Sequence, residues 1–411
     1  MGTIRGIIDL IVIFLIAWLF SNNRQDVLTK KGKNILVMLV LQLIICFLCL
    51  KTTVGIQVMG SISNFFGWLI GQSQAGINFV FGGLEMGAGG VFFFNVLLPL
   101  VFLSALIAIL DYIKVMPFLM KWIGIGVNKI TGMGQLEGQL AISTLILGQP
   151  AGYIPIQEQL KQISGKRLFT LTMSATSTVG MSMLAAYMEL IPGQFVVVAV
   201  LLNIFSPFII TAIMNPYDAE EDQIEHAAAT GAPANLALTT PNAASEDKPS
   251  LFDAISDAIS QGFNLALIIA AMLIGFVSII AFLNNILSAL IGITFTQILG
   301  YIFSPLALAI GVPMADMVEA GSIMATKLLS SEFVAISEML SFGNNITEKT
   351  IAMMSAYAIS FANFGTVGIV TGALKSIDAK QAKVFSGFSM KMMLGATLSA
   401  VLTACIVGFF Y

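Results

Sequence analysis

Charged residues are scarce in this sequence. Only 10% of its 411 residues are charged, 57% are hydrophobic, and the mean hydropathy is +0.93. Because a soluble domain carries about 25% charged residues, such a chain has too few of them to cover a surface that faces water on all sides. Many windows hold the roughly 20 mostly apolar residues that a membrane-spanning helix needs, and the two-residue alternation of outer-membrane strands is absent. The sequence therefore predicts an all-α integral membrane protein.

Histidine and cysteine are also scarce. The one histidine, His226, falls in a polar stretch, which argues against a His-based metal site. Cys46 and Cys49 share a helix face at a spacing that redox or metal pairs also use, but no His or acid accompanies them. We interpret them, with Cys405, as packing residues. With no nucleophile–base pair, we expect no catalytic residue, no metal site, no bound cofactor and no enzyme. No basic soluble domain is present, so we expect no nucleic-acid partner.

The distribution of Lys and Arg predicts the orientation of the chain, because these residues favour cytoplasmic loops. Four of them lie within 24–33, after the first apolar segment, so the N-terminus is expected outside. The stretch 51–90 carries only Lys51 and is expected to be an outside loop. The apolar segments fall at about 6–20, 34–50, 91–110, 140–150, 168–189, 194–214, 255–285, 286–310, 350–374 and 388–410.

Two apolar segments are interrupted by Gly-x-Pro, at Gly148–Pro150 and at Gly311–Pro313. The first lies between basic clusters near Lys129 and Lys161 that both belong inside, and the apolar stretch between them is too short for two spans. A re-entrant hairpin near 138–165 solves this, with the interruption at its tip. The second interruption predicts a hairpin that enters from the outside. Two related pieces in opposite orientation form an inverted repeat.

The helices that follow the hairpins also match, since both contain Thr-Val-Gly, at Thr178–Gly180 and Thr366–Gly368. Small and β-branched polar residues weaken a helix and free backbone carbonyls, which at membrane depth must be buried or line a watery cavity. Paired broken helices in two halves indicate the binding site of a secondary transporter. Between the halves, the acidic stretch 215–250 is expected to be a flexible cytoplasmic linker.

Several motifs resemble those of the concentrative nucleoside transporters, in the branch of bacterial nucleoside permeases. They include "NKITGMGQLE", "ISTLILGQ", "STVGMSMLAAYM", "GSIMATKLLSSEFVA" and "SFANFGTVGIV". The resemblance implies three N-terminal helices, a core of two inverted repeats that each hold a re-entrant hairpin and an unwound helix, a homotrimer, and elevator-type movement. The implied domains are scaffold helices 1–115, a first core repeat 116–214, the linker 215–250, a connecting helix 251–285, and a second core repeat 286–411 with its hairpin near 305–342.

The resemblance also assigns binding roles to the hairpin tips. Gln149 would contact the nucleobase, whereas Pro150 and Ala151 replace two polar residues that normally read it, which leaves the preferred base open. Asp316 would hold the ribose hydroxyls, because a carboxylate accepts two hydrogen bonds with charge-assisted strength. An acid at mid-membrane indicates a functional site. The structural alternatives are a hairpin cap for Gln149 and a helix cap or a salt bridge for Asp316.

In the second unwound helix, the resemblance places Phe361 against the base and Asn363 and Thr366 at the ribose. The alternatives are core packing for Phe361 and Thr366 and an interhelical hydrogen bond for Asn363. Glu332 fits the family motif "SSEFVA" and is interpreted here as a structural residue.

The coupling cation of sodium-dependent members lies between the first hairpin and the first unwound helix. The positions that match by spacing are Thr144, Leu147, Thr178 and Val179. Thr144 replaces an amide oxygen by a hydroxyl, and hard cations prefer shells of several oxygens. Asp316 is a candidate proton carrier. We therefore favour coupling to protons over coupling to sodium.

The sequence thus predicts a multi-pass protein of the cytoplasmic (plasma) membrane, the inner membrane of the cell, which imports nucleosides by cation symport. Its expected partners are a nucleoside, the lipid bilayer and two further copies of the chain. Two alternatives stay open: the same fold importing a modified nucleoside or another ribosyl compound, and a channel or gate of similar fold.

Overall fold

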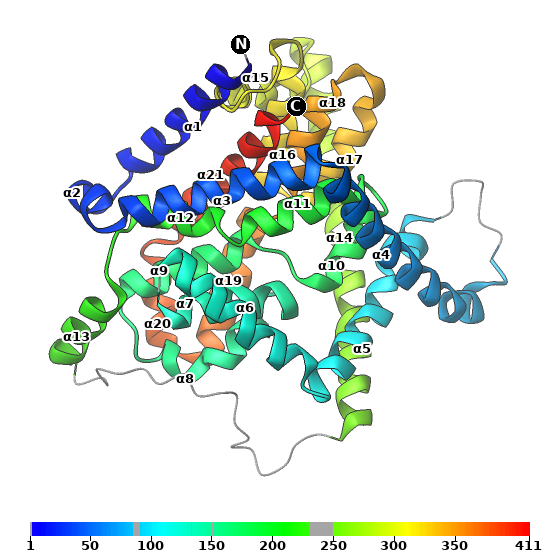
Figure 1. Cartoon of the computed structure of the whole chain (residues 1–411). Coiled ribbons are helices and arrows are strands. Elements are labelled where there is room, and N and C mark those ends of the chain that lie inside the picture. The colour runs from blue at the N-terminus through cyan, green and yellow to red at the C-terminus, as the bar shows by residue number, and fades with distance from the viewer. Residues whose placement is uncertain (1, 85–90, 133, 150, 231–249) are drawn as a thin grey trace.

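The computed structural model describes residues 2–84, 91–132, 134–149, 151–230 and 250–411. In these ranges every regular element is helical, and none is a strand (Figure 1). Seven helical stretches in them are long and apolar enough to cross a bilayer, namely Gly32–Lys51, Thr53–Phe81, Phe93–Tyr112, Gly165–Met188, Gly193–Met214, Leu251–Ile291 and Ser389–Phe409. The predicted all-α, multi-pass membrane protein is confirmed.

The N-terminal helices include one that the sequence did not predict. In order they are α1 (Gly2–Leu19), α2 (Arg24–Asp26), a π-helical turn (Val27–Lys31), α3 (Gly32–Lys51) and α4 (Thr53–Phe81). Much of the expected outside loop 51–90 is therefore the 29-residue helix α4, whose first turn is capped by the Thr52 hydroxyl accepting from the Gly55 N–H. Scattered Gly, Ser and Gln lower its hydropathy without breaking the helix, because no proline interrupts it.

The longest of the described helices packs along a shorter helix that precedes the first core repeat. After a π-helical turn (Phe93–Leu97), α5 (Pro99–Tyr112) packs along α14 (Leu251–Ile291), and the two stand side by side in Figure 1. Helix α14 continues past the expected end at 285, and the apolar stretch 286–310 is split. Gly292 ends α14 with φ +74°, which a glycine adopts readily. Thr294 and Gln297 then form a capping box that starts the next helix.

The first core repeat holds a hairpin and then a broken helix. Its elements are α6 (Val115–Thr131), α7 (Gln135–Leu147), a 3-10 turn (Ala151–Ile156), α8 (Gln157–Leu160), α9 (Gly165–Ser177), α10 (Met181–Met188), α11 (Gly193–Asn203) and α12 (Ser206–Met214). The Ser143 hydroxyl donates to the Gly152 carbonyl at 2.6 Å and so closes the hairpin across its tip. The hairpin runs from α7 to α8, and the break between α9 and α10 lies at 178–180.

The second core repeat has the same order. Its elements are α15 (Phe295–Ala309), a 3-10 turn (Met314–Asp316), α16 (Met317–Leu329), α17 (Glu332–Phe342), a 3-10 turn (Gly343–Asn345), α18 (Glu348–Ala358), α19 (Phe364–Ile377), α20 (Ala379–Ser386) and α21 (Ser389–Phe409). The arms of the hairpin are α16 and α17, and the turn between them lies beside the second break, where Glu332 accepts from Asn363. Helix α15 corresponds to α6 of the first repeat. Gly311–Pro313, where the sequence placed the tip, therefore lies in the turn that precedes the hairpin. The Ser331 hydroxyl accepts from the Val334 N–H and starts α17 as a separate helix.

The linker between the halves is not flexible throughout. Residues 219–230 form α13 (Ala219–Thr230), at the lower left of Figure 1. Residues 215–218 and 250 are described and are not helical, and 231–249 lie outside the described residues. Three acids in the first turn of α13, Glu220, Glu221 and Asp222, suit the positive end of the helix dipole. Part of the acidic stretch is therefore an ordered helix.

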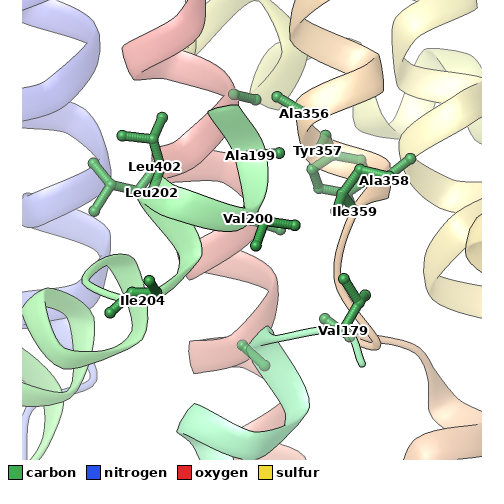
Figure 2. Close-up of a cluster of buried hydrophobic side chains, with 14 of the residues drawn as sticks. Val179, Ala199, Val200, Leu202, Ile204, Ala356, Tyr357, Ala358, Ile359 and Leu402 are labelled. Atoms are coloured by element: carbon green, nitrogen blue, oxygen red, sulfur yellow. The ribbon is translucent and has the colours of Figure 1, made fainter. Parts of the chain in front are cut away.

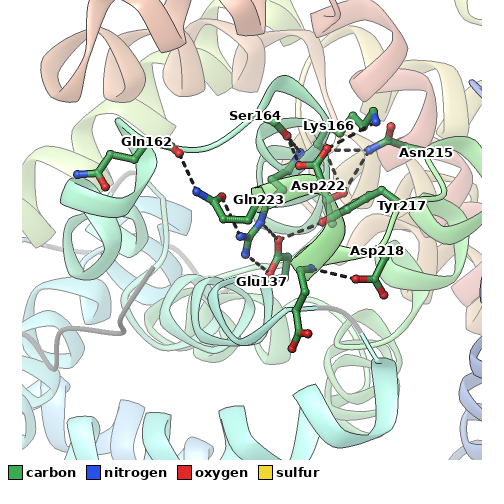
Figure 3. Close-up of polar contacts among 12 residues, drawn as sticks. Glu137, Gln162, Ser164, Lys166, Asn215, Tyr217, Asp218, Asp222 and Gln223 are labelled. Atoms are coloured by element: carbon green, nitrogen blue, oxygen red, sulfur yellow. Dashed lines mark hydrogen bonds and ion pairs between the residues drawn. The ribbon is translucent and has the colours of Figure 1, made fainter. Parts of the chain in front are cut away.

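A buried polar network ties α13 to the base of the first hairpin (Figure 3). Arg167 on α9 makes a bidentate ion pair with Glu137 on α7, at 2.7 and 2.9 Å, and Tyr217 donates to the same carboxylate at 3.0 Å. On α13, Asp222 accepts from the Ser164 hydroxyl. Burial, reinforced by the Glu137 charge, raises the pKa of Tyr217 well above its ordinary value, so the phenol remains a donor. A cavity of about 190 Å³ borders this network, and its lining does not include Gln149.

We expect Arg167→Met to lower the free energy of unfolding by about 3–5 kcal/mol, because the fully buried Glu137 carboxylate loses its counter-charge. The matched control is Lys161→Met. It breaks an ion pair of similar length with Glu158, at 2.8 Å, but both of those side chains are largely exposed, and its effect should stay below about 1 kcal/mol. Denaturant unfolding of both variants in detergent gives the comparison. Equal losses in the two variants would contradict the role assigned to the buried pair.

Candidate substrate site between the two unwound helices

The tip of the first hairpin lies directly on the first unwound segment. Helix α7 ends at Gly148, whose φ of +75° side-chain-bearing residues rarely adopt. A Cβ added to Gly180 would lie 2.8 Å from the Gly148 Cα, so the two glycines let the backbones touch. Between α9 and α10, Thr178 and Gly180 have extended backbone, as the Thr-Val-Gly sequence predicted. The first tip and the first break therefore form one unit.

Gln149 is the polar side chain at this tip. Both its amide oxygen and its amide nitrogen are buried, and neither has a hydrogen-bond partner among the described residues. A buried amide left without a partner costs about 1–3 kcal/mol, so a ligand with a donor and an acceptor would stabilise it. Pro150, which follows, lies outside the described residues, and Ala151 begins the 3-10 turn.

The second break lies at 359–363, between α18 and α19. Asn363 caps α19, since its side-chain oxygen accepts from the Thr366 N–H at 3.0 Å. The Thr366 hydroxyl donates to the Phe361 carbonyl, and the partly buried Phe361 side chain packs on the core. The two Thr-Val-Gly triplets are thus not structurally equivalent, because Thr366–Gly368 lies within the first turns of α19 and the break precedes it.

The two breaks approach each other in the core. Figure 2 shows Val179 of the first segment near Ile359 of the second, with Val200 of α11 beside them. The Ile359 carbonyl, which the break frees from the helix, accepts from the Asn203 amide, and Asn203 in turn accepts from the Thr403 hydroxyl at 2.6 Å. The unwound backbone is buried in protein and paired there, as membrane depth requires.

Glu332 is the carboxylate that joins the two repeats. It is 4% exposed, and it accepts from the Tyr187 hydroxyl of α10 at 3.0 Å and from the Asn363 amide at 3.4 Å. The first donor belongs to the first repeat and the second to the unwound helix of the second repeat. Sequence reasoning treated Glu332 as a structural residue, although an acid in an apolar membrane segment signals function.

Lys327 lies close to this carboxylate and was not predicted at all. Its side chain is 0% exposed, and its ammonium donates to the Tyr357 carbonyl at 2.7 Å and to the Ser360 hydroxyl. The same ammonium lies 4.3 Å from the centroid of the Tyr357 ring. The Lys327 side chain therefore holds the end of α18 at the second break, within electrostatic range of Glu332.

Asp316 has a different environment from the one predicted. One of its carboxylate oxygens accepts three hydrogen bonds, from the Thr347 N–H at 2.9 Å, from the Thr347 hydroxyl at 2.6 Å and from the Thr350 hydroxyl at 2.6 Å. These bonds hold the N-terminus of α18. Among the described residues, no hydrogen bond joins Asp316 to Gln149 or Asn363. The structure thus favours the helix-capping interpretation of Asp316 over ribose binding.

The cation-coupling candidates lie together at the first tip and the first break. The Thr178 hydroxyl donates to the Thr144 hydroxyl oxygen at 3.2 Å, and the Thr144 hydroxyl donates to the Leu140 carbonyl at 2.9 Å. The Thr144 carbonyl accepts from Gly148. Val179 is 1% exposed and Leu147 is partly buried. Most oxygens of this cluster already take part in hydrogen bonds.

Family models match almost the whole chain. The model described as the C-terminus of the Na+ dependent nucleoside transporters matches residues 195–408, just over half of the chain, and the corresponding N-terminus model matches residues 8–84. A model described as nucleoside recognition matches residues 93–194. The chain belongs to the concentrative nucleoside transporter family. It is therefore a nucleoside transporter of a bacterial type, as the resemblance of its motifs implied.

Relatives and solved structures match this transporter over almost its whole length. The purine nucleoside transport protein NupG of Bacillus subtilis is 31% identical, over 98% of both chains. The nucleoside permease NupC of Helicobacter pylori is 28% identical, over 100% of this chain and 98% of its own. A structure of CNTnw in an inward-facing substrate-bound state matches with a TM-score of 0.89 and 26% identity, over 100% of this chain and 98% of that one.

Proposed function

We propose that this transporter imports nucleosides by cation symport, with the nucleoside bound between the first hairpin tip and the second unwound helix. The observation that carries the proposal is the position of Glu332 between Tyr187 and Asn363. A ribose has vicinal hydroxyls, and a carboxylate accepts from two hydroxyls with charge-assisted strength. The unpartnered amide of Gln149 is suited to the edge of a nucleobase, which offers both donors and acceptors. Glu332 thus takes the ribose role that the sequence gave to Asp316.

Purine nucleosides are natural first substrates to test, because NupG is named a purine nucleoside transport protein. Pro150 and Ala151 carry no side-chain donors or acceptors, so Gln149 is left as the polar side chain of the tip. A site that reads the base through one amide discriminates weakly between bases. The second candidate substrate is a modified nucleoside or another ribosyl compound, and the altered tip favours it.

Protons are the proposed coupling ion. Thr144 and Thr178 supply hydroxyls that bond one another and the Leu140 carbonyl, and a sodium ion would have to displace these bonds to gain oxygen ligands. Thr144 also lacks the amide oxygen that the resemblance implies for sodium-dependent members. Sodium coupling remains the alternative, and uptake measured with separate proton and sodium gradients distinguishes the two.

An elevator movement and a trimer complete the proposal. CNTnw has been solved in inward-facing, intermediate and outward-facing states, and this chain matches them with TM-scores of 0.86–0.89. Helices α4 and α14 bury little of their apolar surface within one chain, and contacts with lipid and with two further copies would cover it. The domain boundaries that the sequence predicts are proposed together with this movement.

We expect purified transporter in proteoliposomes to accumulate purine nucleosides when an inwardly directed proton gradient is imposed, and not when a sodium gradient alone is imposed. A panel of nucleosides and free ribose, each with the two gradients applied separately, gives the measurement. Protein-free liposomes and a protonophore are the controls. Accumulation driven by sodium alone would contradict proton coupling, and uptake without accumulation under either gradient would favour a channel.

A further inference from the structure

A groove of about 480 Å³ lies between the end of α1 and the start of α21. Its volume falls within the range of about 300–1,000 Å³ that is usual for sites of small molecules. The lining has an apolar part and a polar part, formed by Leu19, Phe20, Met390 and Leu394 and by Ser21 and Lys391. None of these residues belongs to the proposed nucleoside site, so the groove is a separate feature.

Helix α1 connects this groove with the lipid-facing side of the molecule. The helix stands at the edge of the molecule in Figure 1. A row of side chains at i,i+4 spacing, each at least half exposed, runs along it: Ile7, Ile11, Leu15 and Leu19. Because exposed apolar side chains of a membrane helix face acyl chains, and Leu19 also lines the groove, an acyl chain that follows this row continues into the groove.

The groove lies at the cytoplasmic boundary of the membrane. Four Lys and Arg follow α1 within residues 24–33, and three lysines precede α21 within residues 375–383. Such clusters favour the cytoplasmic side. Trp18, in the last turn of α1, is 38% exposed, and tryptophan is enriched at the level of the lipid headgroups. The polar part of the groove is therefore at headgroup depth.

Two cations lie at this end of the groove. The Lys391 ammonium donates to the Asn22 side-chain oxygen at 2.5 Å. The Arg24 guanidinium donates to the Leu19 carbonyl at 2.9 Å and lies 4.8 Å from the centroid of the Trp18 ring. Among the described residues, neither cation forms an ion pair, and no acid lines the groove. Because an ammonium has three donors, Lys391 can bind an anion and keep its bond to Asn22.

Ser21 supplies a further donor. Its hydroxyl oxygen is buried and has no hydrogen-bond partner among the described residues, and a buried hydroxyl without a partner is costly. The cavity beside α13 has the opposite character, since acids such as Asp26 and Asp218 line it. Charge complementarity thus favours an anion in the groove and disfavours one in the cavity.

We propose that the groove binds an anionic phospholipid of the cytoplasmic leaflet. The lipid phosphate accepts from Lys391, Arg24 and Ser21, and one acyl chain covers the apolar part of the lining and continues along α1. A zwitterionic lipid carries a second, positive group that the two cations repel, so the site selects lipids with a net negative charge. The proposal depends neither on the coupling ion nor on the nucleoside site.

The first test is quenching of Trp18 fluorescence by brominated lipids. The chain has three tryptophans, so Trp68→Phe/Trp122→Phe leaves Trp18 as the single fluorophore. This protein is reconstituted in phosphatidylcholine vesicles that contain equal small fractions of either brominated phosphatidylglycerol or brominated phosphatidylcholine. We expect stronger quenching by the phosphatidylglycerol. A basic residue near anionic lipid contributes about fivefold in affinity, so Lys391→Gln should lower this preference by about fivefold.

The matched control for Lys391→Gln is Lys383→Gln. Lys383 is exposed, belongs to the basic cluster that precedes α21 and does not line the groove, so its replacement should keep the preference. Three results would overturn the proposal. Equal quenching by the two lipids would exclude selection of an anionic lipid, and equal losses in the two lysine variants would indicate general attraction to the membrane surface. Quenching by neither lipid would mean that protein covers the groove.

A second measurement uses thermal unfolding of the full-length protein in an uncharged detergent. A ligand that binds the folded state raises the unfolding temperature, so added phosphatidylglycerol should raise it more than phosphatidylcholine does. Met390 is 58% exposed, so Met390→Trp adds bulk to the groove without entering the core and should remove most of this difference, whereas Met390→Leu should keep it. The same difference in all three proteins would place the lipid elsewhere and refute the site.

Discussion

Glu332→Gln should raise the nucleoside concentration needed for half-maximal uptake by about 10- to 150-fold, the equivalent of the 1.5–3 kcal/mol of a hydrogen bond to a charged group. The two carboxylate oxygens of Glu332 accept from Tyr187 and Asn363 at 3.0 and 3.4 Å, and the glutamine amide has the same size but one acceptor oxygen, so it keeps one of these bonds. It lacks the charge that strengthens bonds from ribose hydroxyls. Radiolabelled uptake, with binding by isothermal titration to the purified protein, measures the loss.

The control for Glu332→Gln is the other acid, Asp316. Because Asp316 bonds Thr347 and Thr350 at the N-terminus of α18, Asp316→Asn should lower the thermal stability by about 1 kcal/mol, as the loss of a helix cap does, and should change nucleoside affinity little. The opposite pattern, with Asp316→Asn abolishing binding and Glu332→Gln sparing it, would return the ribose role to Asp316. A 2′-deoxynucleoside should also lose less affinity on Glu332→Gln than its ribonucleoside does.

The fold was largely predictable because its main signals are local. Low charge predicted the membrane, and Gly148 ends the first arm of the first hairpin with a positive φ. Gly311 also has a positive φ, but it lies in the turn between α15 and α16, which precedes the second hairpin. Helix α4 was missed because its hydropathy is low for a membrane helix. Helix α13 was missed because composition alone does not show that Arg167 and Tyr217 form a polar network against it.

The candidate site was predictable only in part, because it depends on contacts between distant residues. Gln149 and Asn363 lie at the first tip and the second break, as predicted. The choice between Asp316 and Glu332 depends on where α16 ends and α17 begins, and the sequence gives such boundaries poorly. The partners of Lys327 are the Tyr357 carbonyl and Ser360, about thirty residues away along the chain. No spacing rule connects a lysine in one helix with the carbonyls that a break in another helix sets free.

The ammonium of Lys327 is expected to matter almost as much as the carboxylate of Glu332. In Lys327→Met the Tyr357 carbonyl loses a donor at 2.7 Å, Ser360 loses its partner, and Glu332 loses the nearby positive charge. Removing one member of a buried charged group costs about 3–5 kcal/mol, so we expect a marked loss of thermal stability together with loss of uptake.

Two further variants separate a positioning role of Lys327 from a purely structural one. In Glu332→Gln/Lys327→Met both charges are gone, so the double variant should be more stable than Lys327→Met alone, and the coupling energy from the cycle should be about 0.5–3 kcal/mol. Lys327→Arg keeps the charge but changes its geometry, so it should recover stability while half-maximal uptake still needs more nucleoside than in the wild type. If Lys327 positions Glu332, replacing the lysine must cost less stability once that carboxylate is neutral. Additive losses in the cycle would therefore mean that Lys327 supports α18 alone.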